Sequence, residues 1–341
     1  MKRTFIITGG NSGLGLQCAR NIALQNADNC VVIASRNTEK SIEAVEKLRR
    51  ETQNTDIHSL RLNLASLQSV REFVEEFGKR DFPPLYGIAC NAISGGGAAT
   101  ADGFDMTFGT GHLGHFLLVN LLLKQMCEGR IMFVSSDQHD PPPFIARLRY
   151  TDALDYARPN RQNHNIRYSF TKLCNIYTAY ELSARLQATP SKAKITVNAF
   201  NPGFMADTGL ATPRNAAERF LQRIAPLIAS VMGVRSSAPV SGKLLAGYMT
   251  IPEYEGITGK YFDRAHETKS SKLSYNRENA LNLWNRSVEL TQVQFDESVH
   301  NAADMEKAEH PGSSSNLVRI PEHIHPYANP DVLHSTGLSF R

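Results

Sequence analysis

Thr8-Gly9-Gly10-Asn11-Ser12-Gly13-Leu14-Gly15 is the stretch of the chain that decides its fold. It lies between a short apolar run at residues 4–7 and a segment with apolar residues at helical spacing, residues 15–26. Glycines at these positions let the backbone turn sharply and approach a pyrophosphate, and the free N–H groups of a helix N-terminus attract phosphate charge. A strand, this turn and a helix therefore predict a dinucleotide-binding site, with a glycine turn needed only for packing as the alternative.

The alternation of strand and helix continues outward from this turn. Further buried strands are expected at 30–34, 58–62, 85–90, 130–134, 195–200 and 259–262, and helices at 38–52, 69–78, 105–127, 168–187, 241–249 and 276–293. Such alternation predicts a parallel sheet with right-handed crossovers. We therefore expect a single Rossmann-like, doubly wound α/β domain over residues 1–299, with helices on both faces of the sheet.

Three segments lie outside this pattern. Residues 137–167 contain Pro141-Pro142-Pro143 and predict a long loop beside the substrate. Residues 204–240 contain an amphipathic helix, 214–234, which predicts a lid over an apolar substrate, with contact to a membrane surface as the alternative. Residues 300–341 are rich in Ser, Pro, His and Asn and predict a C-terminal tail or arm.

Composition excludes several classes of protein. With 341 residues, 41% hydrophobic and 21% charged, the chain is neither collagen-like nor wholly disordered. The net charge of +4 comes without a dense basic stretch, so no nucleic-acid partner is expected. Five scattered cysteines without a C-x-x-C pair, and no secretory signal, predict reduced thiols and a cytoplasmic location. No apolar stretch is long enough for an integral membrane segment; peripheral membrane contact and homo-oligomers stay open.

The end of the second expected strand predicts the choice of cofactor. A carboxylate at this position would bind the ribose 2′-hydroxyl of NAD. The chain instead has Ser35-Arg36, with no acid until Glu39. A guanidinium and a hydroxyl suit a 2′-phosphate, which favours NADP(H) over NAD, whereas a solvated surface arginine is the alternative.

A tyrosine and a lysine predict the reaction chemistry. Tyr168 and Lys172 are four residues apart, so both side chains share one face of a helix. A nearby ammonium stabilises a phenolate and is expected to lower the pKa of Tyr168, which suits a proton donor or acceptor at a carbonyl or carbinol oxygen. Ser136 follows the fifth expected strand and can hydrogen-bond the same oxygen.

Taken in order, these motifs resemble the short-chain dehydrogenase/reductase family over about residues 3–290. They are T-G-x-x-x-G-x-G at 8–15, the serine pair at 135–136, Y-x-x-x-K at 168–172 and Asn201-Pro202-Gly203. The stretches 114–118, 172–175 and 206–210 are similar to the branch that holds retinol-dehydrogenase-like enzymes and light-dependent protochlorophyllide reductases. Bacterial ketoreductases of the anthracycline type are also similar.

The resemblance implies a role for each matching residue. Tyr168 would be the general acid or base, Lys172 would hold the nicotinamide ribose, and Ser136 would contact the substrate oxygen. The residues expected to bind the cofactor are Thr8, Gly9, Asn11, Ser12, Gly13, Leu14, Gly15, Ser35, Arg36, Asn63, Leu64, Asn91, Tyr168, Lys172, Pro202 and Gly203. No metal site is expected, because His112 and His115 have no evident third ligand and family likeness gives them a packing role.

Four positions depart from the family pattern. The catalytic asparagine of the family, which supports a proton-relaying water, aligns with Gly111. Ile93 replaces the glycine of the Asn-Asn-Ala-Gly motif, and Asn63 replaces the aspartate that meets adenine. Phe204 stands where protochlorophyllide reductases usually carry cysteine, which argues against pigment photoreduction.

The sequence thus predicts an NADP(H)-dependent oxidoreductase that interconverts a carbonyl and an alcohol on a mainly apolar substrate. One alternative is a light-dependent protochlorophyllide-type reductase of a C=C bond. The other is a cofactor-binding sensor or scaffold with weakened catalysis, which the residues at 93 and 111 motivate.

Overall fold

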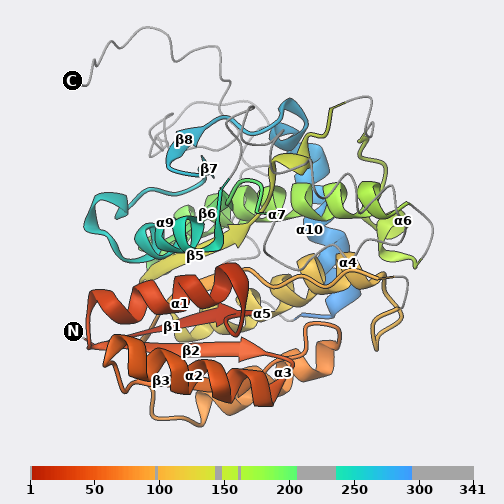
Figure 1. Ribbon diagram of the computed structural model, residues 1–341. Coiled ribbons are helices and arrows are strands. Elements are labelled where there is room, and N and C mark those ends of the chain that lie inside the picture. The colour runs from red at the N-terminus through yellow and green to blue at the C-terminus, as the bar shows by residue number, and fades with distance from the viewer. Residues whose placement is uncertain (1, 97–98, 143–147, 160–162, 206–235, 294–341) are drawn as a thin grey trace, which may run out of the picture.

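The computed structural model describes residues 2–96, 99–142, 148–159, 163–205 and 236–293. These residues form one eight-stranded sheet in the order β3-β2-β1-β4-β5-β6-β7-β8 (Figure 1). The strands are β1 (Arg3–Thr8), β2 (Asn29–Ser35), β3 (Ile57–Arg61), β4 (Leu85–Cys90), β5 (Gly129–Val134), β6 (Ile195–Asn201), β7 (Tyr261–Asp263) and β8 (His266–Thr268). Neighbours from β3 to β7 pair in parallel, and β8 runs antiparallel to β7. The doubly wound α/β prediction is confirmed.

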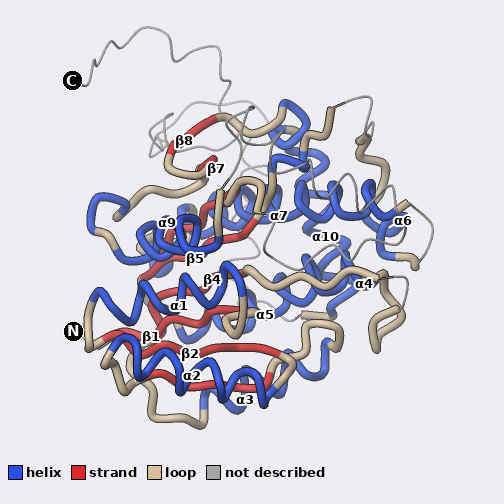
Figure 2. Tube along the Cα trace, in the orientation of Figure 1, coloured by secondary structure: helices blue, strands red, loops and turns tan. Residues whose placement is uncertain are grey.

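Helices cover both faces of the sheet (Figure 2). One apolar core lies between the sheet and α1 (Gly13–Gln25), α2 (Thr38–Thr52) and α9 (Ala238–Thr250). The other lies between the sheet and α3 (Leu67–Gly78), α5 (Gly114–Leu122) and α7 (His164–Gln187). Strand residues alternate between the two cores: Ile6 faces one, and Phe5 and Ile7 face the other. Continuous apolar runs are therefore required in the central strands.

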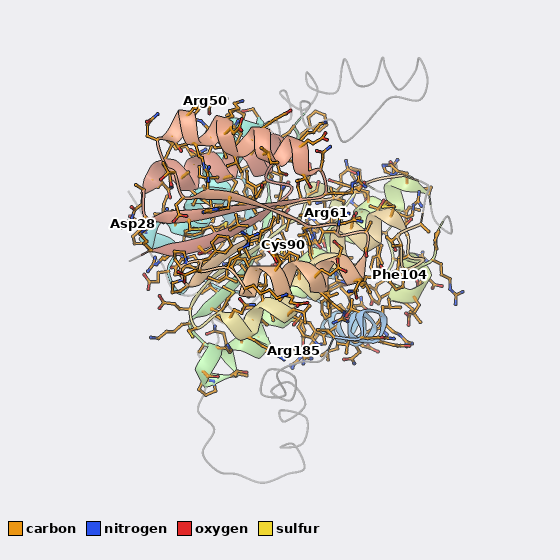
Figure 3. The ribbon with its side chains drawn as sticks, turned by 90° about the horizontal axis from the view of Figure 1, so that it is seen from below. Asp28, Arg50, Arg61, Cys90, Phe104 and Arg185 are labelled. Carbon is orange, nitrogen blue, oxygen red and sulfur yellow. The ribbon has the colours of Figure 1, made fainter. Side chains whose placement is uncertain are left out.

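The strand order reverses between β1 and β4, and this reversal positions the site. Strands added after β1 go to one side of it and strands from β4 onward go to the other. In open α/β sheets, ligands bind outside the carboxyl ends of the strands at this point. Cys90, at the end of β4, is 1% exposed and lies near the middle of the molecule (Figure 3).

The long helix predicted at 105–127 is interrupted. It consists of α4 (Met106–Phe108), a π-helical turn η1 (Gly109–Leu113), α5 and a 3-10 turn η2 (Leu123–Gln125). Together they make one helical run, Met106–Gln125, that is long and apolar enough to cross a membrane by length and composition alone, and 89% of its apolar window is buried inside the protein. The apolar side chains of this helical run are therefore explained by their packing in the protein core, which includes α3.

The structure corrects three local predictions. Helix α7 begins at His164 instead of Tyr168, because the Asn163 side chain caps it by accepting a hydrogen bond from the Ile166 N–H. The predicted loop 137–167 contains a 3-10 turn, η3 (Asp137–His139), and a short helix, α6 (Ala153–Ala157). Strand β8 was not predicted, since its three residues are exposed and carry no apolar alternation.

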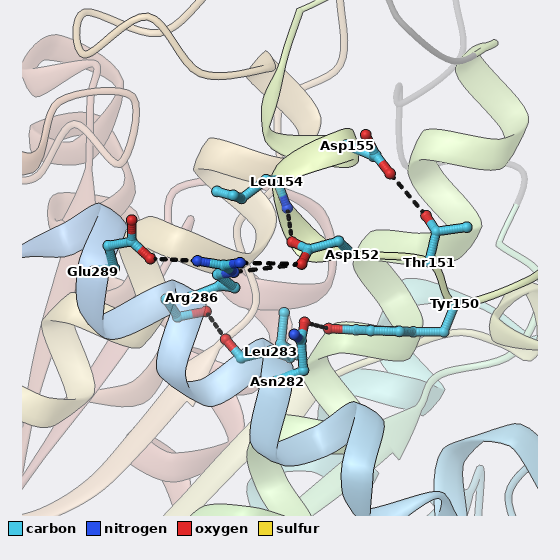
Figure 4. Close-up of polar contacts among 10 residues, drawn as sticks. Tyr150, Thr151, Asp152, Leu154, Asp155, Asn282, Leu283, Arg286 and Glu289 are labelled. Carbon is cyan, nitrogen blue, oxygen red and sulfur yellow. Dashed lines mark hydrogen bonds and ion pairs between the residues drawn. The ribbon is translucent and has the colours of Figure 1, made fainter.

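Side-chain contacts bind the described part of the 137–167 segment to the last helix, α10 (Arg277–Thr291). Tyr150 Oη donates to Asn282 Oδ1 at 2.8 Å, and the Arg286 guanidinium lies 3.4 Å from Asp152 Oδ2 (Figure 4). Asp152 also caps α6. Helix α10 thus holds this segment against α7 beside the expected substrate site.

Short 3-10 turns complete the described chain, namely η4 (Pro190–Lys192), η5 (Pro252–Tyr254) and η6 (Lys272–Tyr275). The motif stretch 206–210, the predicted lid helix at 214–234 and the predicted tail at 300–341 lie outside the described residues. The lid and the tail therefore stay predictions.

Candidate active site

The glycine turn after β1 has the backbone that a dinucleotide site requires. Gly9 and Gly13 adopt φ of +66° and +50°, a region that side chains disfavour. A Cβ on Gly15 would lie 2.5 Å from the Gly9 carbonyl oxygen, so no other residue fits there without moving the turn. Positive φ values thus favour glycine at positions 9 and 13, and steric contacts require glycine at position 15.

The N-terminus of α1 is available for a phosphate. Its N-cap residue, Ser12, makes no side-chain capping hydrogen bond, and the first turn carries no acidic residue. A Cβ on Gly13 would meet no atom of the described chain within 4 Å, so the backbone of Gly13 lies at the protein surface. Uncapped N–H groups at a helix N-terminus attract an anion. Asn11 and Ser12 lie in this turn, and Leu14 packs into the core. The residues therefore fit a dinucleotide.

Ser35 and Arg36, the two residues predicted to contact a 2′-phosphate at the end of β2, lie in different environments. Arg36 is exposed just beyond the strand. Ser35 is 7% exposed, and its hydroxyl lies 2.6 Å from the Ser41 hydroxyl, which donates in turn to the Asn37 carbonyl. Ser35 thus shapes the turn before α2, and its predicted contact with a 2′-phosphate stays a prediction. The exposed guanidinium of Arg36 is the stronger candidate for that contact.

The ends of β1 and β4 are joined by Thr8 and Asn91. Thr8 Oγ1 accepts hydrogen bonds from the backbone N–H groups of Asn91 and Ala92 at 2.8 and 3.0 Å. Asn91 Nδ2 donates to the Thr8 carbonyl at 2.8 Å. Both residues therefore fix two strand ends at the reversal point, where the cofactor site is predicted.

The predicted adenine-side residues follow β3. Asn63 Oδ1 accepts from the Ala65 N–H at 3.2 Å, and a carbonyl oxygen keeps a second lone pair for an amino group. Leu64 is buried, and a Cβ on Gly114 would lie 2.7 Å from its carbonyl oxygen. Leu64 therefore fixes the spacing between the loop and α5.

The turn after β6 is also built for close approach. Gly203 has φ of +81°, and its N–H donates to Asn201 Oδ1 at 3.0 Å. The Pro202 carbonyl accepts from the Ser241 hydroxyl of α9 at 2.6 Å. Asn201 Nδ2 donates to Asp263 Oδ1 at 2.9 Å. The predicted nicotinamide contact, residues 202–203, is thus anchored from β7 and α9.

The three predicted catalytic residues come together at the end of β5 and the first turns of α7. The Lys172 ammonium is 5.5 Å from the centre of the Tyr168 ring and donates to the Val134 carbonyl at 3.0 Å. Ser136 lies close enough to Tyr168 for its side chain to lower the pKa of the phenol. The Ser135 hydroxyl donates to the Lys172 carbonyl at 2.8 Å, which joins the strand end to the helix.

Burial sets the protonation of the two central groups. Burial raises the pKa of Tyr168 to about 12, the nearby Ser136 side chain lowers it, and the charge of Asp137 raises it. Burial lowers the pKa of Lys172 to about 8. The pKa of Tyr168 is raised and not lowered as the sequence predicted, because desolvation is the largest effect on it and Lys172 is not among its causes. Tyr168 is held protonated, as a proton donor must be.

Sequence reasoning missed Asn175 and Asp137. Asn175 lies three residues after Lys172 on the same helix face, and its Nδ2 donates to the same Val134 carbonyl at 3.0 Å. This spacing was the signal that could have identified it. Asp137 directly follows the predicted catalytic serine and accepts from the Ser136 hydroxyl at 2.9 Å. No periodicity marks Asp137, since it lies in a turn.

Ile93 and Gly111, which both depart from the family pattern, pack against each other. A Cβ on Gly111 would lie 2.7 Å from Thr171 Cγ2 and 2.8 Å from Ile93 Cδ1. Ile93 and Thr171 therefore fill the space that a side chain at 111 would need. Gly111 cannot take the asparagine of the family pattern without movement of these neighbours.

Both candidate histidines have side-chain partners inside the protein. His115 Nε2 is 2.9 Å from Thr8 Oγ1, and His112 Nε2 is 2.8 Å from Ser287 Oγ. Burial lowers the pKa of His112 to about 3 and that of His115 to about 4, so both are neutral packing residues. A set of potential metal ligands that the sequence did not suggest lies at the amino-terminal edge of the sheet, with donor atoms within 4.8 Å of one another: Cys30, Asp56 and His58.

Comparison with known proteins places this geometry in a family. Residues 3–147 match the family model described as short chain dehydrogenase. The chain is 34% identical over 298 residues to the WW domain-containing oxidoreductase of Danio rerio, covering 85% of this chain and 68% of that protein. It is 31% identical over 301 residues to polyprenol dehydrogenase of Homo sapiens, covering 85% and 86%. A crystal structure of a putative uncharacterized protein from Mycobacterium paratuberculosis superposes with a TM-score of 0.61 at 26% identity, covering 86% of this chain and 94% of that one.

The motifs, the strand reversal and the relatives agree on one oxidoreductase family. Relatives above 30% identity match more than four fifths of this chain, well beyond the glycine turn. The chain belongs to the short-chain dehydrogenase family.

Proposed function

We propose that the protein is an NADP(H)-dependent oxidoreductase that interconverts a carbonyl and an alcohol, with Tyr168 as the general acid or base. The observation that carries this proposal is the meeting of Ser136, Tyr168 and Lys172 at the carboxyl end of β5. When bound, the nicotinamide supplies or accepts the hydride.

The side chains of this chain would perform the proton chemistry. Ser136 donates a hydrogen bond to the substrate oxygen and positions it beside the Tyr168 hydroxyl. In reduction, Tyr168 gives its proton to that oxygen, and the Lys172 ammonium stabilises the phenolate that results. Residues 202–203 and Asn91 would orient the cofactor, and the N-terminus of α1 would hold its pyrophosphate.

A mainly apolar substrate is the class we favour. The relative named polyprenol dehydrogenase acts, by its name, on an apolar alcohol. The predicted lid of this chain carries apolar residues at helical spacing: Phe220, Leu221, Ile224, Leu227, Ile228 and Val231. A lid of this composition would cover an apolar substrate and exclude water from the reacting centre.

The function is tested by following NADPH oxidation with a panel of apolar aldehydes, ketones and quinones, in the dark and under light. Turnover in the dark that is selective for a carbonyl supports the proposal. Reduction of protochlorophyllide only under light would replace it with the photoreductase alternative. Binding of NADPH without turnover of any carbonyl would instead support the sensor or scaffold alternative, which the packing at Gly111 favours.

We expect Arg36→Ala to weaken NADPH binding by roughly 10- to 100-fold, the loss typical of hydrogen bonds to a charged group. NADH affinity should stay unchanged, because NADH has no 2′-phosphate. Fluorescence titration with both cofactors measures the effect. Arg50→Ala is the matched control, since Arg50 is an exposed arginine near the far end of α2. An equal loss for NADPH and NADH would contradict the assignment of Arg36.

A further inference from the structure

The amino-terminal edge of the sheet, at the opposite end of the strands from the candidate active site, brings together a thiol, an imidazole and a carboxylate. They belong to Cys30 on β2, His58 on β3 and Asp56, which directly precedes β3. One donor atom of each residue lies within 4.8 Å of the other two. All three groups are common ligands of zinc in proteins. The function proposed above uses none of them, so an inference about them does not depend on it.

The pairing of β2 with β3 brings these side chains together. The strands run parallel with Val32 beside His58, and the Val31 N–H donates to the Asp56 carbonyl at 2.9 Å. Because side chains alternate along a strand, Cys30 and Val32 share one face of β2, and Asp56 and His58 share the matching face beside it. Cys30 and Val32 both pack into the core on that face. The backbone register therefore places the three donor groups at one corner of the sheet.

Further contacts restrict the two polar side chains. The Asp56 N–H donates to Asn54 Oδ1 at 2.8 Å, and Asn54 is itself buried. The centres of the His58 and Phe82 rings are 5.1 Å apart, and His58 Nε2 lies 2.7 Å from Asp56 Oδ1. An imidazole and a carboxylate that are held in this way lose less conformational entropy when a metal ion fixes them.

The three groups are reached from solvent on one side only. Cys30 is fully buried, whereas the side chains of His58 and Asp56 are 37% and 29% exposed. His58 and Asp56 line a surface cleft of about 670 Å³. An ion that enters from this cleft would meet the sulfur at its inner side and keep water at its outer side. Three protein ligands and one water are a common zinc arrangement.

The charges around the cleft do not exclude a divalent cation. Lys2 and Arg80 line the cleft together with the carboxylates of Asp56 and Asp81. The Arg80 guanidinium also pairs with Glu76 at 2.6 Å. Repulsion of a cation by the two basic side chains is therefore offset by nearby carboxylates, and a bound thiolate adds one more negative charge.

The distances among the donor atoms are close to those of a zinc site. Zinc bonds of about 2.0–2.3 Å in a tetrahedron place the ligand atoms about 3.3–3.8 Å apart. Donor atoms within 4.8 Å of one another therefore need to approach by about 1 Å at most. The contact between His58 and Asp56 needs to open slightly from 2.7 Å. Both of these side chains are partly exposed, so rotation about their χ angles can make these shifts.

We propose that Cys30, Asp56 and His58 bind one zinc ion, which joins β2 to β3 at this edge of the sheet. Zinc is favoured over Mg²⁺ and Ca²⁺, because those ions prefer oxygen ligands and this set includes sulfur and nitrogen. The ion gains bonds to the Cys30 sulfur, an imidazole nitrogen and a carboxylate oxygen. The Cys30 S–H bond breaks, its electron pair binds the ion, and its proton passes to water. No residue is oxidised or reduced.

Cobalt(II) tests the ligands directly, because it can replace zinc and its bond to a thiolate gives an intense charge-transfer band in the near ultraviolet. Titration of the full chain with reduced thiols should give this band, saturating at one cobalt per protein. Cys30→Ser should remove the band. His58→Gln should weaken cobalt and zinc binding by at least about 100-fold, since even residues that only support a ligand typically contribute 10–100-fold. Cys127→Ser, at an exposed cysteine, is the matched control and should keep the band.

The thiolate band also separates this site from histidines elsewhere in the chain. His323 and His325 are close in sequence and can bind zinc, but residues 294–341 contain no cysteine and cannot give the band. A wild type without the band, or a band that persists in Cys30→Ser, would overturn the proposal. If Cys30→Ser does not fold, His58→Gln decides the question, because His58 is partly exposed and its replacement leaves the core intact.

Thermal unfolding gives a second measure that needs no absorption band. Zinc should raise the melting temperature of the wild type, because an ion that binds the folded chain preferentially stabilises it. The rise should be much smaller for His58→Gln and for Asp56→Asn at the same zinc concentration. Asp28→Asn, at an exposed aspartate just before β2, should respond to zinc as the wild type does. An equal rise in the wild type, His58→Gln and Asp56→Asn would show that zinc binds elsewhere.

Discussion

Tyr168→Phe is expected to reduce NADPH-dependent carbonyl reduction by roughly 10²- to 10⁴-fold, the contribution of a positioned general acid. The phenylalanine keeps the ring and removes the hydroxyl that lies close to Ser136. Since burial raises the pKa of Tyr168 to about 12, the wild-type hydroxyl stays protonated through neutral pH and can donate. Steady-state and single-turnover kinetics measure the loss in kcat.

Measuring NADPH affinity distinguishes the loss of the Tyr168 hydroxyl from unfolding of the Tyr168→Phe variant. The N-terminus of α1 and the turn at 202–203 are remote from the Tyr168 hydroxyl in sequence and depend on their own hydrogen bonds. Tyr168→Phe should therefore bind NADPH with nearly wild-type affinity. Tyr156→Phe is the control, because the Tyr156 hydroxyl donates to the Arg149 carbonyl, outside the proposed site. Full turnover by Tyr168→Phe would rule out the tyrosine as proton donor.

Asp105→Ala is expected to lower the free energy of unfolding by about 3–5 kcal/mol, the cost of leaving one partner of a buried ion pair alone. Asp105 is 1% exposed and pairs with Arg167, which directly precedes Tyr168. Asp105 Oδ1 also accepts from the N–H groups of Thr107 and Phe108 at 3.0 Å, so it caps α4. One carboxylate thus joins the start of α4 to the start of α7.

Two variants separate the ion pair from the cap. Asp105→Asn keeps an oxygen for the cap and removes the charge, so the difference between the Asn and Ala variants gives the capping contribution of about 1 kcal/mol. Urea unfolding measures both. Glu76→Ala removes an exposed ion pair with Arg80 and should cost less than about 1 kcal/mol. A similarly small loss for Asp105→Ala would show that the Asp105–Arg167 pair does not hold the two helices together.

Local sequence was sufficient for most of the fold. Buried strands and amphipathic helices have periodicities that do not depend on distant partners, and α2 has the bounds that its periodicity predicted. Strand β8 has no such pattern, because it pairs at the edge of the sheet with exposed side chains. The early start of α7 came from a cap at Asn163, which apolar spacing alone does not reveal.

For the candidate site, too, some properties could be predicted from the sequence and others only from the structure. The sequence by itself determined the fold class, the glycine turn and the approach of Ser136, Tyr168 and Lys172, since fixed positions at the ends of parallel strands and on one helix face imply proximity. Only the tertiary structure decided that Ser35 is buried, that desolvation raises the pKa of Tyr168, and that Ile93 and Thr171 close the space beside Gly111. These properties depend on burial and on contacts between segments far apart in the chain, which no local pattern encodes.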